Sequence, residues 1–173
     1  MCRRRRKKRD PEEPDDHALG RSRGGFSTKI HLICDAGGCP IHFETTAGQA
    51  HENASLVELL NGIDDELTTG AGEAVAWPAA IAGDKGYRAA WIDEMLLDMG
   101  VTPVIPSKAN EDREARLAEF DKDRYRQRNI VERLIGWLKE CRCVCSRFEK
   151  TALNFGGMIK MAFIQRYLKM LAP

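Results

Sequence analysis

Two short segments of the sequence carry residue types that could do chemistry. In the first, Gly83-Asp84-Lys85-Gly86-Tyr87 follows the apolar run Ala79-Ala80-Ile81-Ala82, which predicts a buried strand ending just before Asp84. Functional groups of α/β proteins gather at the carboxyl ends of strands, and a carboxylate there could bind a hard cation such as Mg2+. An Asp in this position also commonly caps the helix that follows it, so this segment alone leaves both interpretations open.

The second segment is a predicted helix that presents four functional side chains on one face. At 100° per residue these four lie within about 60° of one another, opposite an apolar arc. They are Tyr125, Arg128, Glu132 and Lys139, and the apolar arc comprises Val131, Leu134, Ile135, Trp137 and Leu138. A carboxylate flanked by cations could bind a metal ion while the cations contact phosphates. The solvent face of an amphipathic helix has the same pattern and is the alternative.

Strands alternate with helices along the rest of the chain, which predicts an α/β domain with a mixed sheet and flanking helices. The clearest unit is a β-hairpin, because strand patterns at 26–34 and 40–45 enclose the turn sequence Asp35-Ala36-Gly37-Gly38. The other expected elements are a short helix over 53–60 that stops at Asn61-Gly62, a loop over 64–78, a strand at 79–82, a helix over 88–99, a strand at 101–105, and long helices over about 123–140 and 151–171.

Residues 1–25 are expected to form a basic, flexible arm. They combine the cationic run from Arg3 to Arg9 with blocks of acidic residues, two prolines and three glycines. Such a composition buries too little apolar surface to order a chain. The sequence therefore predicts two parts, the arm and one folded domain over 26–173.

The overall composition is that of one globular domain. The 173 residues are 43% hydrophobic and 31% charged, which excludes wholesale disorder, collagen-like repeats and a coiled-coil rod. No run approaches the roughly 20 apolar residues of a membrane-spanning helix, and the basic start leads into acidic residues and prolines rather than an apolar signal sequence. We therefore expect a soluble, cytoplasmic protein with no membrane partner.

The formal net charge of +1 conceals a strong segregation of charge. Residues 30–84 contain nine acidic side chains and no Lys or Arg, whereas residues 121–173 contain twelve basic and five acidic ones. The basic ends of the chain could bind a polyanion by neutralising its phosphates. The acidic middle would repel that polyanion unless its carboxylates hold metal ions. An ordinary solvated surface is the alternative interpretation.

The spacing of three of the six cysteines could belong to a zinc module. Structural zinc sites usually combine two pairs of ligands, and Cys141, Cys143 and Cys145 have no second pair or suitably spaced His. Disulfides are not expected in a reducing compartment. We interpret the segment as a short extended piece with small apolar residues on one face.

The two functional segments together resemble a known family. Tyr125-x2-Arg128-x3-Glu132-x6-Lys139 matches the Y-(2)-R-(3)-E-(6)-K signature of bacterial insertion-sequence DDE transposases. Gly83-Asp84-Lys85-Gly86-Tyr87 looks like that family's second acidic motif, and the segment from Gly20 to His31 resembles the stretch between its first and second motifs. The resemblance covers about residues 18 to 170, with the motifs in the family's order.

The resemblance implies a ribonuclease H-like fold in which three carboxylates hold two divalent ions, Mg2+ or Mn2+, that cleave and join DNA strands. Asp84 would be the second catalytic, metal-binding carboxylate and Glu132 the third. Tyr125, Arg128 and Lys139 would bind DNA phosphates. The implied partners are transposon ends and target DNA, with a homo-oligomer in the active complex and a nucleoid-associated location.

The sequence departs from the family at the first carboxylate, which lies on the first, central strand in an Asp-Ser/Thr context. No apolar strand precedes residue 26, and burying the charged run of the arm as a strand would remove several unpaired charges from water. Asp10, Asp15 and Asp16 on the arm, and Asp35 at the hairpin turn, do not match. We therefore expect a partial domain that lacks the central strand, completed by an upstream-frame half. The alternative is a non-catalytic, DNA-binding remnant.

Overall fold

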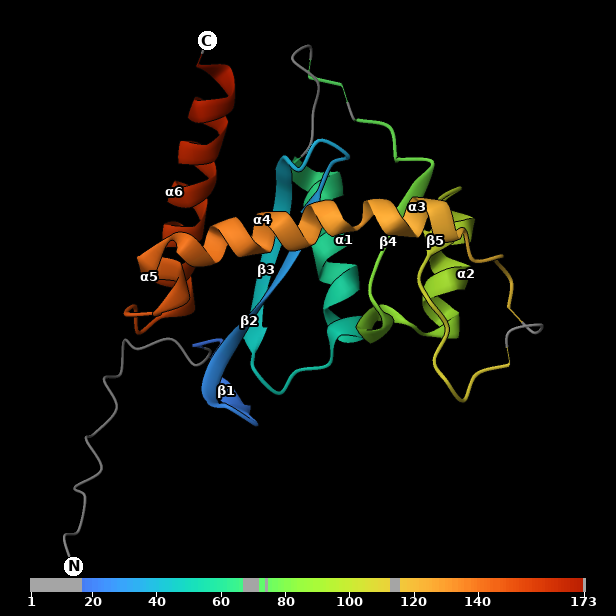
Figure 1. Ribbon diagram of the computed structural model, residues 1–173, viewed down its shortest axis with the longest axis horizontal. Helices are drawn as coiled ribbons and strands as arrows, with labels where there is room; N and C mark the ends of the chain where they lie inside the picture. The colour runs from blue at the N-terminus through green and yellow to red at the C-terminus, as the bar shows by residue number, and fades with distance from the viewer. Residues whose placement is uncertain (1–16, 67–71, 74, 113–115, 173) are drawn as a thin grey trace, which may run out of the picture.

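The computed structural model describes residues 17–66, 72–73, 75–112 and 116–172, which form two small sheets with helices around them (Figure 1). The antiparallel sheet has the order β1 (Gly20–Ser22), β2 (Gly25–Cys34), β3 (Pro40–Ala47), and the parallel pair is β4 (Ala80–Ala82) and β5 (Thr102–Val104). The helices are η1 (Glu52–Ser55), α1 (Leu56–Glu66), η2 (Lys85–Tyr87), α2 (Ala90–Asp98), α3 (Lys122–Gln127), α4 (Asn129–Glu140), α5 (Arg142–Cys145) and α6 (Ala152–Leu171). The predicted α/β class is confirmed. None of the described helices is long and apolar enough to cross a membrane.

The predicted hairpin is present as β2 and β3. Asp35 stabilises its turn, because Oδ1 accepts hydrogen bonds from the backbone N–H groups of Gly37 and Cys39, both at 2.8 Å. Gly38 adopts a φ of +80°, which favours glycine. Within the range predicted for the arm, Gly20–Ser22 form β1 and pair with residues 25–27 of β2. Residues 1–16 lie outside the described residues.

Helix α1 is longer than the sequence predicted, because Gly62 does not end it. The helix continues through Asn61-Gly62 to Glu66. A Cβ built on Gly62 would lie only 2.3 Å from Nε2 of His42 on β3. Glycine therefore serves close packing of the helix against the hairpin, and the expectation that it terminates the helix is wrong. Of the loop predicted after this helix, residues 67–71 and 74 are not described.

The single helix predicted over 123–140 is divided at Arg128. The Arg128 N–H donates to the Tyr125 carbonyl and the Val131 N–H donates to the Arg128 carbonyl, both at 3.0 Å. These i to i+3 bonds tighten one turn between α3 and α4, where Asn129 and two β-branched residues are weak helix formers. Figure 1 shows α3 and α4 almost in line, lying across both sheets.

The cysteine-rich segment is helical rather than extended. Helix α5 forms one turn whose Val144 is buried in a cluster with Leu138 and Phe155, so packing overrides the alternating pattern. The five cysteines from Cys34 to Cys145 are free thiols. Among the residues that the structure describes, no group of three or more His, Cys, Asp or Glu side chains could hold a metal ion.

Two hydrophobic clusters lie on either side of the molecule. The first joins α1 and α2 to the residues on either side of β5. It contains Leu56, Leu59, Leu60, Ile92, Leu96, Val101 and Ile105. The second packs α4, α5 and α6 against the hairpin and contains Leu138, Val144, Phe155, Ile159, Ala162 and Phe163. Helices α2 and α6 lie where the sequence predicted them. Gly100, with a φ of +74°, follows α2, and the Thr151 side chain caps α6.

We expect Gly62→Ala to lower the free energy of unfolding by about 1–3 kcal/mol, because the new methyl group must displace the His42 ring. Gly136→Ala is the matched control: it also lies inside a helix, but nothing lies within 4 Å of its Cβ. That change should raise the free energy of unfolding by about 0.5–1 kcal/mol. Urea unfolding followed by circular dichroism measures both variants, and a stabilised Gly62→Ala protein would contradict the packing role.

Candidate functional site

A cavity of about 1440 Å³ lies between the two sheets, and most of the candidate functional residues line it. Its walls come from β2, from β4 and the turn after it, from α4, and from residues 144–150. Residues 28–34 of β2 pair with β3, and β4 pairs with β5; within the described part of the chain no strand lies between β2 and β4. Strand β4 is therefore partly exposed to this cavity and is not the buried strand that the sequence predicted.

Asp84 directly follows β4 and lies on the wall of the cavity. Its Oδ1 accepts a hydrogen bond from the Gly86 N–H at 2.7 Å, and its carbonyl accepts one from the Tyr87 N–H at 3.1 Å. Asp84 is thus the N-cap of η2, as one of the two interpretations of the sequence proposed. The cap uses a single carboxylate oxygen of an exposed side chain, so it does not compete with a cation at the other oxygen.

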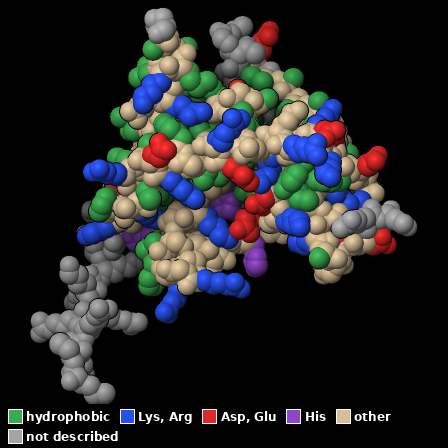
Figure 2. All heavy atoms as spheres, viewed as in Figure 1, with side chains coloured by type: hydrophobic (Ala, Val, Ile, Leu, Met, Phe, Trp, Pro, Cys, Tyr) green, Lys and Arg blue, Asp and Glu red, His purple; other side chains and the backbone are tan. Residues whose placement is uncertain are grey.

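Three of the four signature residues are in contact where α3 meets α4. The Arg128 guanidinium lies 5.4 Å from the centre of the Tyr125 ring and donates a hydrogen bond from Nη2 to Oε1 of Glu132. Arg128 and Lys139 line the same cavity as Asp84, whereas Tyr125 and Glu132 are not among its lining residues. Figure 2 shows Lys and Arg side chains spread along the face that α3 and α4 cross.

The sequence did not single out the buried polar cluster at the base of this site. His31 on β2 is 3% exposed, and its ring lies 2.8 Å from both the Tyr87 hydroxyl and the Thr46 hydroxyl. Burial lowers the pKa of His31 and raises the pKa of Tyr87, so both rings are neutral near pH 7. Alternation along the strand predicts that His31 points inward with Lys29, but no sequence pattern predicts its partners.

Lys29 and Glu52 form a second pair on the cavity wall. Lys29 Nζ lies 2.6 Å from Oε1 of Glu52 and also donates to the carbonyl of Ala50 at 2.6 Å. The bond from Lys29 lowers the pKa of Glu52, which is therefore ionised near neutral pH. The pair joins β2 to η1 and keeps this Lys engaged with protein groups.

The model of the transposase DDE domain family matches residues 3–164, which is most of the chain. The chain belongs to this family. It is 28% identical over 134 residues to "Putative transposase for insertion sequence element IS402" of Burkholderia cepacia, and 26% identical over 144 residues to "Putative transposase for insertion sequence element IS6501" of Brucella ovis. These matches cover 78% and 83% of this chain, and 59% and 100% of the two relatives. No solved structure matches it.

DDE transposases generally use divalent metal ions, and the donor types of this domain are appropriate for them. Hard cations prefer carboxylate oxygens and accept one or two protein carboxylates with water completing the shell. Asp84 provides such an oxygen at the cavity, and Glu132 is linked to the cavity through Arg128. A complete set of three carboxylates does not occur among the described residues.

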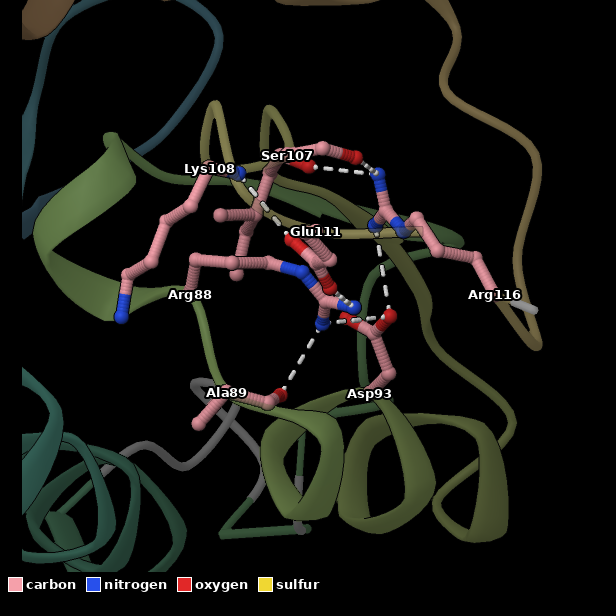
Figure 3. Close-up of polar contacts among 8 residues, drawn as sticks. Arg88, Ala89, Asp93, Ser107, Lys108, Glu111 and Arg116 are labelled. Carbon is pink, nitrogen blue, oxygen red and sulfur yellow. Dashed lines mark hydrogen bonds and ion pairs between the residues drawn. The ribbon is translucent and has the colours of Figure 1, made fainter. Parts of the chain in front are cut away.

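A buried ion network ties the segment after η2 to the loop that follows β5 in this transposase domain (Figure 3). Asp93 on α2 is 1% exposed, and its Oδ2 lies 2.8 Å from Arg88 Nη1 and 3.2 Å from Arg116 Nη2. Arg88 also pairs with Glu111 and lowers its pKa. Arg116 donates to the carbonyl of Ile105 at 3.0 Å. The network therefore connects the segment that follows β4 and η2 with the segment that follows β5.

We expect Asp93→Asn to lower the free energy of unfolding by about 3–5 kcal/mol, because it leaves Arg88 and Arg116 buried without their shared carboxylate. Asp98→Asn on the exposed face of α2 is the matched control and should change the free energy of unfolding by less than about 0.5 kcal/mol. Guanidinium chloride unfolding measures both. Equal effects of the two substitutions would show that the network does not stabilise the domain.

Proposed function

We propose that this transposase domain binds DNA and, in a completed fold, cleaves and joins DNA strands by two-metal-ion phosphoryl transfer. One observation carries the proposal: Asp84 after β4, Arg128 between α3 and α4, and Lys139 of α4 line a single cavity. Segments about 40 residues apart in the sequence thus contribute an anionic and a cationic wall to the same space. That combination suits a phosphate group bridged to a protein carboxylate by a divalent cation.

Each signature residue has a distinct proposed role. Asp84 and Glu132 would hold Mg2+ or Mn2+, which when bound would activate the attacking oxygen and stabilise the leaving oxygen. Arg128 can hold a phosphate in a bidentate manner, whereas Lys139 acts as a point charge. Tyr125 supports the Arg128 guanidinium from its ring face, which limits the orientations available to that side chain.

The proposed complete fold is ribonuclease H-like, with a central strand in the space between β2 and β4. The facing edges of these strands carry backbone groups that a further strand would satisfy, and the wall residues include Ile30, Leu32, Ile81 and Ile135. The cationic residues 3–9 are unsuitable occupants of such an apolar space. We propose that an upstream half supplies this strand with the first carboxylate, and that the complete protein acts as a homo-oligomer on transposon ends and target DNA in the nucleoid.

We expect Asp84→Asn and Glu132→Gln, each in the completed protein, to reduce strand transfer by at least about 100-fold, because each removes a negatively charged metal ligand. Binding of transposon-end DNA should be largely unchanged. Glu140→Gln, at the exposed end of α4, is the matched control and should retain activity. A labelled-oligonucleotide transfer assay measures the reaction, and full activity of Glu132→Gln would contradict the assignment.

A second candidate function is DNA binding without catalysis. It is favoured by the absence of a three-carboxylate group among the described residues. In that case DNA affinity should fall steeply with salt concentration and be indifferent to Mg2+. Metal-dependent strand transfer by the completed protein would contradict it, whereas robust transfer by the isolated chain would contradict the need for completion.

A further inference from the structure

We propose that His31 is a positioning residue for Asp84 and that it acts through the hydroxyl group of Tyr87. This inference rests on the proposed function, in which the Asp84 carboxylate binds a divalent cation. His31 itself touches neither Asp84 nor the reacting groups. Its effect is to hold the turn that carries Asp84 in one place relative to the hairpin.

The ring of His31 is fixed by contacts from three different elements. Nδ1 hydrogen-bonds with the Tyr87 hydroxyl of η2 at 2.8 Å, and Nε2 hydrogen-bonds with the Thr46 hydroxyl of β3 at 2.8 Å. The Ser55 hydroxyl of η1 lies 3.3 Å from the same Nε2. With both nitrogens engaged and the residue 3% exposed, the imidazole has one available orientation.

Tyr87 transmits this position to Asp84 through a single tight turn. Tyr87 is the last residue of η2, and its N–H donates to the Asp84 carbonyl at 3.1 Å. The Gly86 N–H, one residue earlier, donates to Asp84 Oδ1 at 2.7 Å. A displacement of the Tyr87 backbone would therefore lengthen the Asp84 contacts, including the one to the carboxylate.

The contact matters because the hairpin and the Asp84-bearing pair of strands share no backbone ladder among the described residues. The bond between His31 and Tyr87 spans from β2 to the turn after β4, and their rings also meet edge to face, with centroids 6.1 Å apart. Metal ligands bind tightly when their supporting contacts hold them in place before the ion arrives. In this fold a side-chain bond provides the support that a neighbouring strand would otherwise provide.

Tyr87→Phe is the decisive variant, because it removes the hydroxyl and keeps the ring. Tyr167→Phe is the matched control: its hydroxyl donates to the Pro40 carbonyl, far along the chain from the turn. His31→Ala should reproduce the effect of Tyr87→Phe, and the double variant should add little, since both remove the same bond. His31→Ala also removes buried volume, so the conclusion depends on Tyr87→Phe.

The first measurement is amide hydrogen exchange of the full chain by NMR. We expect the Gly86 and Tyr87 amides to exchange about 3- to 10-fold faster in Tyr87→Phe than in the natural protein, and Tyr167→Phe to leave them unchanged. Unchanged exchange at both amides in Tyr87→Phe would overturn the inference, whatever the protein binds.

The second measurement is the affinity for Mn2+ alone, with Asp84→Asn as the reference for loss of the site. Tyr87→Phe should weaken Mn2+ binding by about 3- to 10-fold at unchanged circular dichroism. If the natural protein binds Mn2+ through Asp84 and Tyr87→Phe binds it equally well, the inference is wrong. If Asp84→Asn does not alter Mn2+ binding, Asp84 does not bind the cation in this chain by itself, and amide exchange alone decides whether His31 holds the turn.

Discussion

The facing edges of β2 and β4 impose the constraint on which the rest of the structure depends. Backbone N–H and C=O groups along a sheet edge must pair with another strand, with side chains or with water. Here the space between the two edges is a cavity of about 1440 Å³, so within the described residues the two halves are joined by side chains and helices rather than by a ladder. Ile33 of the hairpin and Ile81 of β4 both pack against the cluster built on α1 and α2, and α4 lies across the gap.

The acidic middle and the basic C-terminal part of the sequence both contribute side chains to the walls of this cavity. The acidic residues 30–84 contribute Asp84 and Glu52 to its walls, and the basic C-terminal part contributes Arg128 and Lys139. Arg128 meanwhile pairs with Glu132, whose side chain is 56% exposed. The Arg128 side chain is only 19% exposed, so the small energy of a surface ion pair does not apply to this contact. A phosphate at Arg128 or a divalent cation at Glu132 would have to compete with the pairing, and the exposure of Glu132 makes its carboxylate accessible to a cation.

The sequence predicts the elements whose signals are local. The hairpin, β4, β5, α2 and α6 follow from apolar and alternating runs, turn residues and caps, and the place of Asp84 directly after β4 follows from the end of the apolar run. The sequence-based predictions are wrong where a contact with a residue far away in the sequence determines the local structure. His42 on β3 explains why Gly62 lies inside a helix, and burial of Val144 explains the helical turn of α5. His31 could not be recognised as part of the site, because its partners come from β3, η1 and η2.

Asp84 lies in the half of the domain where the sheet provides the least support. Strands β4 and β5 pair over three residues each, and so short a two-stranded sheet is not stable alone. The position of Asp84 must therefore depend on what surrounds that pair. The cluster of α1 and α2 supports it from one side, and the network of Arg88, Asp93 and Arg116 fixes the segments that follow both strands. The hydrogen bond between His31 and Tyr87 also links the turn that carries Asp84 to the hairpin. These contacts do not require a strand between β2 and β4, which is why the turn that carries Asp84 keeps a defined conformation beside an open cavity.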